Sequence, residues 1–471
     1  MRLVVVGGGV AGLACAHRAV ELARERGIPL ALTLLEARRR LGGTIATERA
    51  GGFLIEAGPD SFLSEKPWAL ALCRRLGVED RLVRTDDRYR KTFVWFGGRL
   101  HPLPEGFQLL APTRMLPFVT SGLFSWPGKA RMALDLVLPR RRDAGEDESL
   151  GAFVRRRLGR EALERVAQPL VAGIYTADPD ELSLAATMPR FVDVERRERS
   201  LILGLWRAGR RAPAAGTSGA RWSLFVTFAG GMGELVDTLA ARLPAGAAQV
   251  GRRADAIERR GAGWRVEADG GGLDADRVVV ATEAHAAGRL LRYVDPTLAA
   301  LLPAIPYAGS ATVTLGYRRD DVPHPLDGFG FVVPRAERRA LLACTFSSVK
   351  YPGRAPEGHV LLRGFLGGAL DAGTLGLDDE ALVERVRGEL RAALGVTAAP
   401  LLVRVARHPA SMPQYVVGHA RTVEAIERRL DGAPGLALAG SAYRGVGIAD
   451  CVRSGEVAAE RALLGAAAAA G

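Results

Sequence analysis

The amino-acid sequence opens on a short apolar run that passes directly into a glycine-rich segment. Residues 3–6 read Leu-Val-Val-Val, and residues 7–12 read Gly-Gly-Gly-Val-Ala-Gly. A short β-branched run is typical of a buried parallel strand, and the pattern of residues 13–26 predicts a helix behind it. Residues 29–35 form the next apolar run and predict a second strand that ends at Glu36. The order of strand, helix and strand predicts a βαβ unit.

Hydrophobic patterning divides the rest of the chain into three kinds of segment. Residues 1–90 and 220–290 are expected to be α/β, residues 91–215 helical, and residues 300–395 mostly antiparallel. The individual elements expected here are strands at residues 264–268, 277–282, 311–317, 328–333, 341–346, 360–365 and 435–440, a helix at residues 379–394, and a helix that begins in the second half of residues 441–452. Residues 212–219, rich in Gly, Ala and Ser, are the best linker candidate.

The first glycines follow the spacing Gly-x-Gly-x-x-Gly, which is a nucleotide-binding pattern when it connects a strand to a helix. Gly7 permits a tight turn, Gly9 lets a diphosphate approach the backbone, and Gly12 allows the helix to pack closely on the strand. The carboxylate of Glu36 can accept hydrogen bonds from ribose hydroxyls and disfavours a 2′-phosphate. The alternative is an ordinary βαβ unit that binds no nucleotide.

A second glycine pair, Gly42 and Gly43, follows Glu36 at short range. NAD dehydrogenases seldom carry this extension, whereas it resembles the Glu-x5-Gly-Gly stretch of the FAD-dependent amine oxidase superfamily. Glycines at this place let backbone amides approach a diphosphate or a flavin. The pair therefore favours FAD over NAD, with a plain hairpin turn as the alternative.

A third signal lies near the C-terminus. Gly445 and Gly447 precede a predicted helix, and Asp450 falls in its first turn. A helix N-terminus with nearby backbone N–H groups favours the electron-rich end of an isoalloxazine ring. Asp450 is equally well explained as a helix cap. One cofactor held by both ends of the chain predicts a split domain with other material inserted in it.

Composition narrows the class of protein and of partner. Hydrophobic residues make up 48% of the 471 residues, which excludes global disorder. The net charge of +12 comes almost wholly from arginine, because only Lys66, Lys91, Lys129 and Lys350 are lysines. Part of this charge reflects GC-rich coding, and the remainder indicates an anionic substrate or lipid surface rather than nucleic acid. The histidines are isolated and the four cysteines lack metal-ligand spacing, so we expect no metal site.

Further segments occur in the same order as in the oxygen-dependent protoporphyrinogen oxidases. They are residues 53–62 (Phe-Leu-Ile-Glu-Ala-Gly-Pro-Asp-Ser-Phe), 169–175 (Pro-Leu-Val-Ala-Gly-Ile-Tyr), 328–334 (Gly-Phe-Gly-Phe-Val-Val-Pro) and 412–419 (Met-Pro-Gln-Tyr-Val-Val-Gly-His). With the two glycine-rich ends, they make nearly the whole chain similar to this family. The amine-oxidase branch more usually has Arg after the glycine pair, where this chain has Thr44.

The resemblance implies a reaction and a cofactor. In this family a porphyrinogen loses six hydrogens and becomes a porphyrin, in three flavin cycles that pass electrons to O2 and release hydrogen peroxide. It implies non-covalent FAD as the centre of the chemistry, so we predict no catalytic side chain. We predict protoporphyrinogen IX as the substrate, in haem biosynthesis. The alternatives are coproporphyrinogen III, another flavin oxidoreductase of the amine or carotenoid oxidase type, and a binding protein that has lost its flavin.

The resemblance also implies which residues form the site. The expected cofactor-binding residues are Gly7, Gly8, Gly9, Val10, Ala11, Gly12, Glu36, Ala37, Gly42, Gly43, Thr44, Gly58, Pro59, Asp60, Ser61, Ala254, His408, Ser441, Val446, Gly447 and Ile448. The expected substrate-binding residues are Thr92, Gly173, Phe329, Val332 and Met412. Phe331 is a further candidate wall of the slot, but it should alternate to the opposite strand face from Phe329 and is as readily explained as core.

Two positions depart from the family pattern. Thr92 stands where the family commonly has an arginine that pairs with a substrate propionate, and Arg90 and Lys91 are the neighbouring cations. A shift of one or two residues along a strand changes the face that a side chain occupies, so the propionate partner stays open. His408 stands where relatives often have a tryptophan close to the flavin.

The resemblance implies an α/β fold with a split, Rossmann-like FAD-binding domain. Its expected parts are residues 1–90, 220–295 and 406–471, with a substrate-binding α+β domain at residues 300–405 and a helical basic domain at residues 91–215.

The basic segment at residues 91–215 predicts peripheral association with an anionic membrane surface from the cytoplasmic side. It combines arginine runs with apolar side chains that suit an amphipathic helix at a headgroup layer. Those apolar side chains are Phe118, Phe124, Trp126, Leu201 and Trp206. A solvated basic face over an ordinary helical domain is the alternative. We expect no membrane-spanning segment, no secretory signal and no nucleic-acid partner, and leave a homodimer open.

Overall fold

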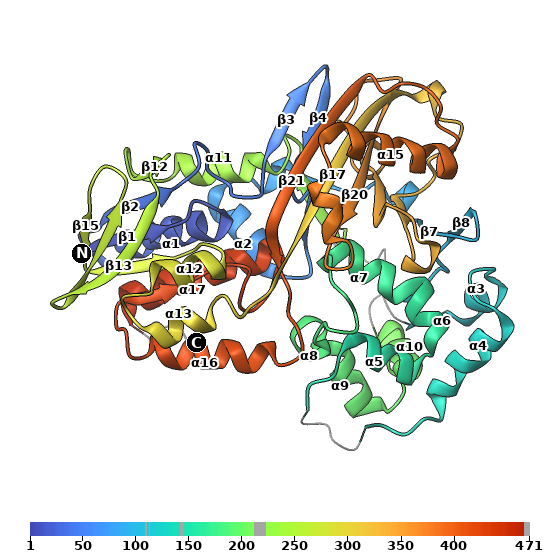
Figure 1. Cartoon of the computed structure of the whole chain (residues 1–471), viewed down its shortest axis with the longest axis horizontal. Helices are drawn as coiled ribbons and strands as arrows, with labels where there is room; N and C mark the ends of the chain where they lie inside the picture. Colours follow the sequence, from blue (N-terminus) through green and yellow to red (C-terminus); the bar gives the residue numbers. More distant parts are fainter. Residues whose placement is uncertain (109–110, 113, 142–145, 212–222, 466–471) are drawn as a thin grey trace.

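The structure, a computed structural model, describes residues 1–108, 111–112, 114–141, 146–211 and 223–465. The linker expected at residues 212–219 lies outside these described residues. Three parts are visible in Figure 1: a parallel sheet between layers of helices, a large mixed sheet, and a group of helices beside that second sheet.

The parallel sheet is assembled from three distant stretches of the chain. Its five strands lie in the order β12-β2-β1-β16-β22. They are β1 (Arg2–Val6), β2 (Ala31–Glu36), β12 (Ala248–Val250), β16 (Arg277–Val280) and β22 (Leu436–Leu438). The last four residues of β1 are buried because both faces of the sheet are covered. The predicted α/β class is confirmed.

Helices cover one face of this sheet, and a smaller sheet with further helices covers the other. The first layer contains α1 (Val10–Arg26), α2 (Pro67–Leu76), α11 (Gly233–Ala241) and α17 (Ile448–Leu464). The second layer contains the antiparallel strands β13 (Ala254–Arg260), β14 (Gly263–Ala268) and β15 (Leu273–Ala275), with α12 (Ala284–Leu290), α13 (Pro296–Leu301) and α16 (His419–Leu430). Short strands complete this part: β3 (Thr47–Ala50) with β4 (Phe53–Glu56), and β5 (Phe62–Leu63) and β6 (Leu82–Arg84) on either side of β11 (Phe225–Phe228).

The second sheet has seven strands in the order β21-β17-β20-β19-β18-β7-β8. They are β7 (Thr92–Phe96), β8 (Arg99–Pro102), β17 (Tyr307–Arg318), β18 (Gly330–Val332), β19 (Ala343–Phe346), β20 (His359–Gly367) and β21 (Leu402–Pro413). Helix α15 (Asp379–Leu394) contributes buried leucines to the hydrophobic cluster on one face. The strands expected between residues 311 and 365 are present, and the expected helix at residues 379–394 is confirmed.

Strands β7 and β8 correct the expected start of the helical segment, which was placed at residue 91. The segment Thr-Phe-Val-Trp-Phe of β7 is β-branched and aromatic, as strands prefer. Gly97 and Gly98 have φ of 59° and 75°, the left-handed pair that a tight hairpin requires. Strand β7 then pairs in parallel with β18, with Phe93 opposite Phe331. This pairing joins residues far apart in sequence, so local patterning does not reveal it.

Apart from the short α14 (Ser347–Lys350), which follows β19, the remaining helices form a compact group beneath the second sheet (Figure 1). They are α3 (Met115–Thr120), α4 (Trp126–Ala133), α5 (Leu150–Arg157), α6 (Arg160–Ala162), α7 (Gln168–Tyr175), α8 (Leu184–Thr187), α9 (Pro189–Glu198) and α10 (Leu201–Arg211), with a π-helical turn at Leu163–Ala167. Of the apolar side chains expected on its surface, Phe118, Phe124 and Leu201 are instead buried in its core, where they pack against apolar side chains of the neighbouring helices. Trp126 and Trp206 remain 71% and 39% exposed.

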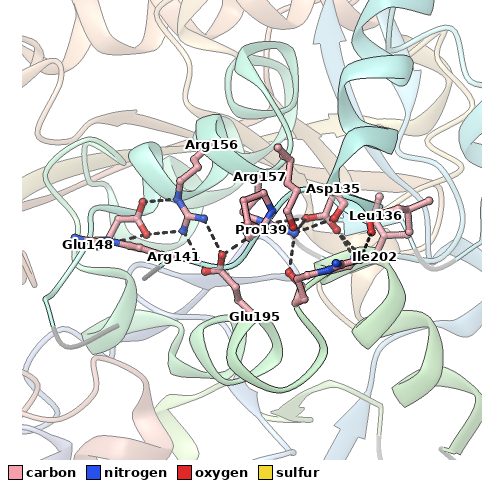
Figure 2. A network of polar contacts seen from close by, with 12 residues as sticks. Asp135, Leu136, Pro139, Arg141, Glu148, Arg156, Arg157, Glu195 and Ile202 are labelled. Carbon is pink, nitrogen blue, oxygen red and sulfur yellow. Dashed lines mark hydrogen bonds and ion pairs between the residues drawn. The ribbon is translucent and has the colours of Figure 1, made fainter. Parts of the chain in front are cut away.

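A buried ion pair ties these helices together (Figure 2). Asp135 and Arg157 are both fully buried, and the Arg157 Nε donates to Asp135 Oδ1 over 2.7 Å. The other guanidinium hydrogens bond backbone carbonyls, and the second carboxylate oxygen accepts from Ser200 Oγ and from the backbone N–H of Ile202. Every polar atom of the pair is therefore satisfied, which a buried charge requires.

We predict that Arg157→Met strongly destabilises the protein. It leaves the Asp135 carboxylate buried without its cation, and such changes cost about 3–5 kcal/mol of unfolding free energy. The neighbouring Arg155 provides a matched control, since it pairs with Asp180 on the surface. Its replacement by methionine should cost about 0–1 kcal/mol. Urea unfolding followed by circular dichroism compares the two, and equal losses would contradict the assignment.

Candidate functional site

The loop between β1 and α1 leaves a helix N-terminus open to a ligand. The Gly7 N–H donates to the Leu35 carbonyl over 2.8 Å, and a Cβ at Gly12 would collide with the Gly7 carbonyl oxygen. Gly9 occupies the N-cap position of α1, but no side chain there accepts a hydrogen bond from the helix. The first turn, which begins with Val10 and Ala11, contains no acidic residue. Such an uncapped N-terminus favours an anionic group.

Glu36, at the end of β2, is a buried carboxylate with spare acceptor capacity. Its Oε2 accepts from the Gly8 N–H over 2.7 Å, and its Oε1 from the Arg38 N–H over 2.8 Å. A carboxylate has about four acceptor sites, so room remains for two hydroxyl groups. Ala37 is exposed beside it. Ala254, at the start of β13, is held nearby because the Arg252 N–H donates to the Glu36 carbonyl.

The second glycine pair lies directly on the first glycine loop. The Gly42 N–H donates to the Gly8 carbonyl over 2.8 Å, and Gly9 and Gly42 form a β-bridge. Gly42 and Gly43 have φ of 99° and 61°, and a Cβ at Gly43 would lie 3.2 Å from the Gly9 Cα. The two motifs read separately in the sequence therefore form one continuous backbone surface.

Two arginines that the sequence analysis overlooked lie on this surface. The Arg40 guanidinium donates to the Gly43 carbonyl over 2.7 Å and to the Ile45 carbonyl over 2.9 Å, while Arg38 reaches the Gly43 carbonyl over 3.3 Å. Burial, and then the nearby Arg38, lowers the pKa of Arg40. Two cations beside an uncapped helix N-terminus suit a diphosphate. The sequence signal for these two residues was the arginine run before Gly42. It was overlooked because arginine is common throughout the chain.

The C-terminal motif reaches the same place through α17. A Cβ at Gly455 would collide with the Ala11 carbonyl oxygen, so α17 and α1 touch backbone to backbone. Helix α17 begins at Ile448 after Gly447, and Asp450 accepts from the Gly447 N–H over 3.2 Å and from Lys66 Nζ over 2.6 Å. The cap interpretation of Asp450 is confirmed.

Tyr415 holds the loop that precedes α17. Its hydroxyl donates to the Ser441 carbonyl over 2.6 Å and accepts from the Gly445 N–H over 2.7 Å. Its ring stacks on His419, with ring centroids 3.8 Å apart. Val446, in the same loop, packs against the core of the helical group. This loop therefore connects the parallel sheet with the helices.

The loop of residues 57–61 packs on the glycine pair from another side. A Cβ at Gly58 would collide with the Thr44 carbonyl oxygen. Asp60, beyond the half-buried Pro59, accepts from Ser61 Oγ over 2.7 Å and from Lys350 Nζ over 3.1 Å. Burial raises the pKa of Asp60, but Lys350 and then Arg363 outweigh it and lower that pKa to about 2. The Asp60 side chain is thus engaged with the second sheet.

His408, on β21, faces the same loop. Its Nε2 donates to the Ala57 carbonyl over 2.8 Å. Burial lowers the pKa of His408, and Arg363, Arg38 and Arg40 lower it further, while the Ala57 hydrogen bond acts in the opposite direction. The ring is therefore neutral at pH 7, with its proton on Nε2 and a lone pair on Nδ1.

The predicted substrate residues meet where α7 approaches the second sheet. A Cβ at Gly173 would lie 3.9 Å from Val332 Cγ1, and Ile174 beside it is 45% exposed. Gln414 Nε2 donates to the Tyr175 carbonyl at the end of α7 and to the Met412 carbonyl, each over 3.1 Å. Gly173 therefore lies beside Val332, and Gln414 connects the end of α7 with Met412.

Phe329 and Thr92 lie at the edge of this group. Thr92 pairs with Gly330, and the Phe329 N–H donates to the Lys91 carbonyl over 2.8 Å. Phe329 is half-buried, whereas Phe331 is fully buried against Trp95 and Phe346. Phe331 therefore belongs to the core, as the strand alternation allowed.

The cations next to Thr92 are already paired. Lys91 Nζ lies 2.8 Å from Asp327 Oδ2, and Arg90 Nη2 lies 2.7 Å from Asp87 Oδ1. Over the part of the chain that the structure describes, no group of three or more His, Cys, Asp or Glu side chains could hold a metal ion. Within the same residues, no helix combines the length and the apolar content needed to cross a bilayer.

Comparisons with known proteins agree with this geometry. The sequence profile described as "Flavin containing amine oxidoreductase" matches residues 10–463. The chain is 37% identical to a coproporphyrinogen III oxidase of Bacillus subtilis (98% of this chain, 97% of that one). It is 38% identical to one of Propionibacterium freudenreichii (98% and 90%) and 32% identical to a protoporphyrinogen oxidase of Bos taurus (98% and 97%).

A solved structure from Exiguobacterium sp. 255-15 has a similar fold over the whole chain. That protein is described as a "Putative protoporphyrinogen oxidase", and it superposes with a TM-score of 0.86 at 33% identity, covering 98% of both chains. The reduced UDP-galactopyranose mutase structure, at 15% identity and a TM-score of 0.73, shares the fold alone.

Proposed function

The chain belongs to the flavin containing amine oxidoreductase family, and we propose that it is an FAD-dependent oxidase that converts a porphyrinogen into a porphyrin in haem biosynthesis, with O2 as electron acceptor. The observation that carries this proposal is similarity along nearly the whole chain to porphyrinogen oxidases, together with an intact backbone surface at both glycine-rich ends.

The residues present suit a non-covalently held FAD. Glu36 would bind the ribose, the α1 N-terminus with Arg40 the diphosphate, and the loops at Thr44 and Gly447 the flavin. When bound, FAD supplies a two-electron acceptor that O2 reoxidises to give hydrogen peroxide, so that three rounds remove six hydrogens.

The titratable side chains around the site are committed to structural hydrogen bonds. His408 donates to the Ala57 carbonyl, His419 Nε2 donates to the Tyr443 carbonyl, and Asp450 binds Lys66 and caps α17. We therefore expect none of them to be an indispensable acid or base. The protein's task is therefore to bind and orient the macrocycle beside the flavin and to exclude water, with Gly173 leaving space for a flat ring.

We take protoporphyrinogen IX as the substrate, in line with the sequence analysis. A specific observation favours coproporphyrinogen III as a second candidate: the two relatives at 37% and 38% identity carry that name, against 32% for the bovine protoporphyrinogen oxidase. The two substrates differ in carboxylate number, and each desolvated propionate needs a cationic or hydrogen-bonding partner.

We predict that the protein purifies yellow, and that acid precipitation releases the flavin because no covalent bond holds it. Arg40→Met should raise the dissociation constant of FAD about tenfold, which corresponds to about 1.4 kcal/mol, because a charge-assisted contact is lost. Arg39→Met, in the same loop, is the matched control and should change little. Flavin fluorescence during titration of the apoprotein measures both. Flavin that stays in the precipitate would contradict non-covalent binding.

The function is tested by supplying each reduced porphyrinogen and following porphyrin fluorescence and hydrogen peroxide. We expect turnover of protoporphyrinogen IX with a higher kcat/KM than that of coproporphyrinogen III. A preference of tenfold or more for coproporphyrinogen III, about 1.4 kcal/mol in transition-state stabilisation, would assign the second candidate instead. Oxidation of tyramine or phytoene without porphyrinogen turnover would overturn the proposed function.

We further propose that the helical group associates with an anionic membrane surface. Apart from Ile174 and Trp206, its exposed apolar side chains lie on α3, α4 and the turn that follows, close to Arg140 and Arg141 in sequence. They are Met115, Leu116, Val119, Trp126, Leu134, Leu136 and Val137. Lys129 lies over the exposed Trp126 ring, with its Nζ 4.5 Å from the ring centroid.

Flotation with anionic liposomes tests this surface. The wild-type protein should float at low salt and less at high salt, because charge attraction is screened. The double variant Leu116→Ser with Trp126→Ser should float less at both. Leu401→Ser is the control, since Leu401 is 59% exposed outside the helical group. No flotation at either salt concentration would remove the proposal.

A further inference from the structure

The peptide that joins Ala57 to Gly58 has an unusual hydrogen-bond environment. Its carbonyl oxygen accepts two hydrogen bonds, from His408 Nε2 over 2.8 Å and from Arg363 Nη2 over 3.1 Å. Its N–H, on Gly58, has no hydrogen-bond partner among the described residues, although Gly58 is buried. Buried N–H groups without a partner are rare, so this one points to a missing acceptor.

Arg363 brings a full positive charge to this peptide from the second sheet. It lies on β20, is 4% exposed, and within the described residues its side chain makes one hydrogen bond, to the Ala57 carbonyl. Arg363 belongs to a cluster of charged side chains. Its cations are Lys350, Arg354 and Arg363, and its carboxylates are Glu56 and Asp60, so the cations outnumber the carboxylates by three to two. The cluster behind the peptide therefore has a net positive charge.

The same peptide borders the glycine surface that is assigned to the cofactor. Gly58 packs so closely on the Thr44 carbonyl that no Cβ fits, and the Ala57 N–H donates to the Ala46 carbonyl over 2.9 Å. Arg38 and Arg40, the two cations of that surface, are close enough to His408 to affect its pKa. The unpartnered N–H thus lies at the boundary between the glycine loops and β21.

We propose that Arg363 and His408 act as positioning residues that polarise the Ala57–Gly58 peptide, so that the Gly58 N–H stabilises negative charge on the reduced flavin. This inference rests on the proposed function, because it requires a flavin at the glycine surface. Donors bonded to the carbonyl of a peptide strengthen its N–H as a donor, and a preorganised donor stabilises developing charge without reorganisation. The reduced flavin carries more negative charge than the oxidised flavin, so its stabilisation raises the reduction potential.

The test is the two-electron reduction potential of the bound flavin, measured by equilibration with a reference dye. Arg363→Met should lower the equilibrium constant for reduction about tenfold, which is about 30 mV. Arg363→Lys should recover part of the loss. Arg354→Met is the matched control: it removes a buried cation from the same cluster, but Arg354 bonds Thr227 and the Phe228 carbonyl instead of Ala57. Its potential should stay near the wild-type value.

His408→Phe provides an independent variant if Arg363→Met does not fold. It removes one donor from the Ala57 carbonyl and should also lower the potential, by less than Arg363→Met because no formal charge is lost. Potentials unchanged in both variants, or an equal fall in Arg354→Met, would overturn the inference while the proposed function stands. A wild-type protein that binds no flavin would instead overturn the proposed function, and this inference with it.

Discussion

The backbone contact between α1 and α17 is the constraint on which the rest of the structure depends. Gly455 allows α17 to lie against Ala11 with no side chain between them. Both helices begin at the same edge of the parallel sheet, so this contact brings the N-terminus of α17 beside the glycine loop of α1. A larger residue at Gly455 would separate the two ends of the chain and divide the site between them.

The site that results is formed mostly by backbone. At Gly12, Gly42 and Gly58 the backbone lies so close to neighbouring atoms, most of them backbone carbonyls, that a Cβ would collide or force a shift. Side chains act around this surface: Glu36 ties Gly8 to Arg38, Tyr415 ties Ser441 to Gly445. Such an arrangement presents N–H groups and cations to a bound group. It suits chemistry in which the cofactor, and not a side chain, exchanges electrons with the substrate.

The sequence predicted those features that depend on local patterns. The β1–α1 turn, the strand that ends at Glu36 and the helix behind Gly447 follow from apolar period and glycine spacing, and the structure confirms these elements. The pairing of β7 with β18 was missed because parallel neighbours are set by tertiary contacts, and the burial of Phe118 was missed because a short helix does not reveal which face meets the core.

The candidate site was predictable in its glycines and less so in its charges. Glu36 was predicted as a ribose-binding residue because it stands at the end of the second strand of a βαβ unit. Arg38 and Arg40 were hidden in a chain with 64 basic residues, where an arginine run carries little information. The cations that contact Asp60 come from strands far along the chain, and only their positions in space connect Lys350 and Arg363 with the loop at Gly58.

The residues next to Thr92 do not reveal the choice of substrate from the sequence, because the charge partners of these residues become apparent only in the structure. Lys91 and Arg90 are paired with Asp327 and Asp87, and all four side chains are at least 40% exposed. Exposed pairs of this kind contribute about 0–1 kcal/mol, so a substrate carboxylate that arrives with its own charge can replace Asp327 or Asp87 at little cost. A missing arginine at position 92 therefore does not deprive this edge of cations, because carboxylates that compete for Lys91 and Arg90 are held weakly. We propose that discrimination between two and four propionates depends on how many such pairs the bound macrocycle can reach.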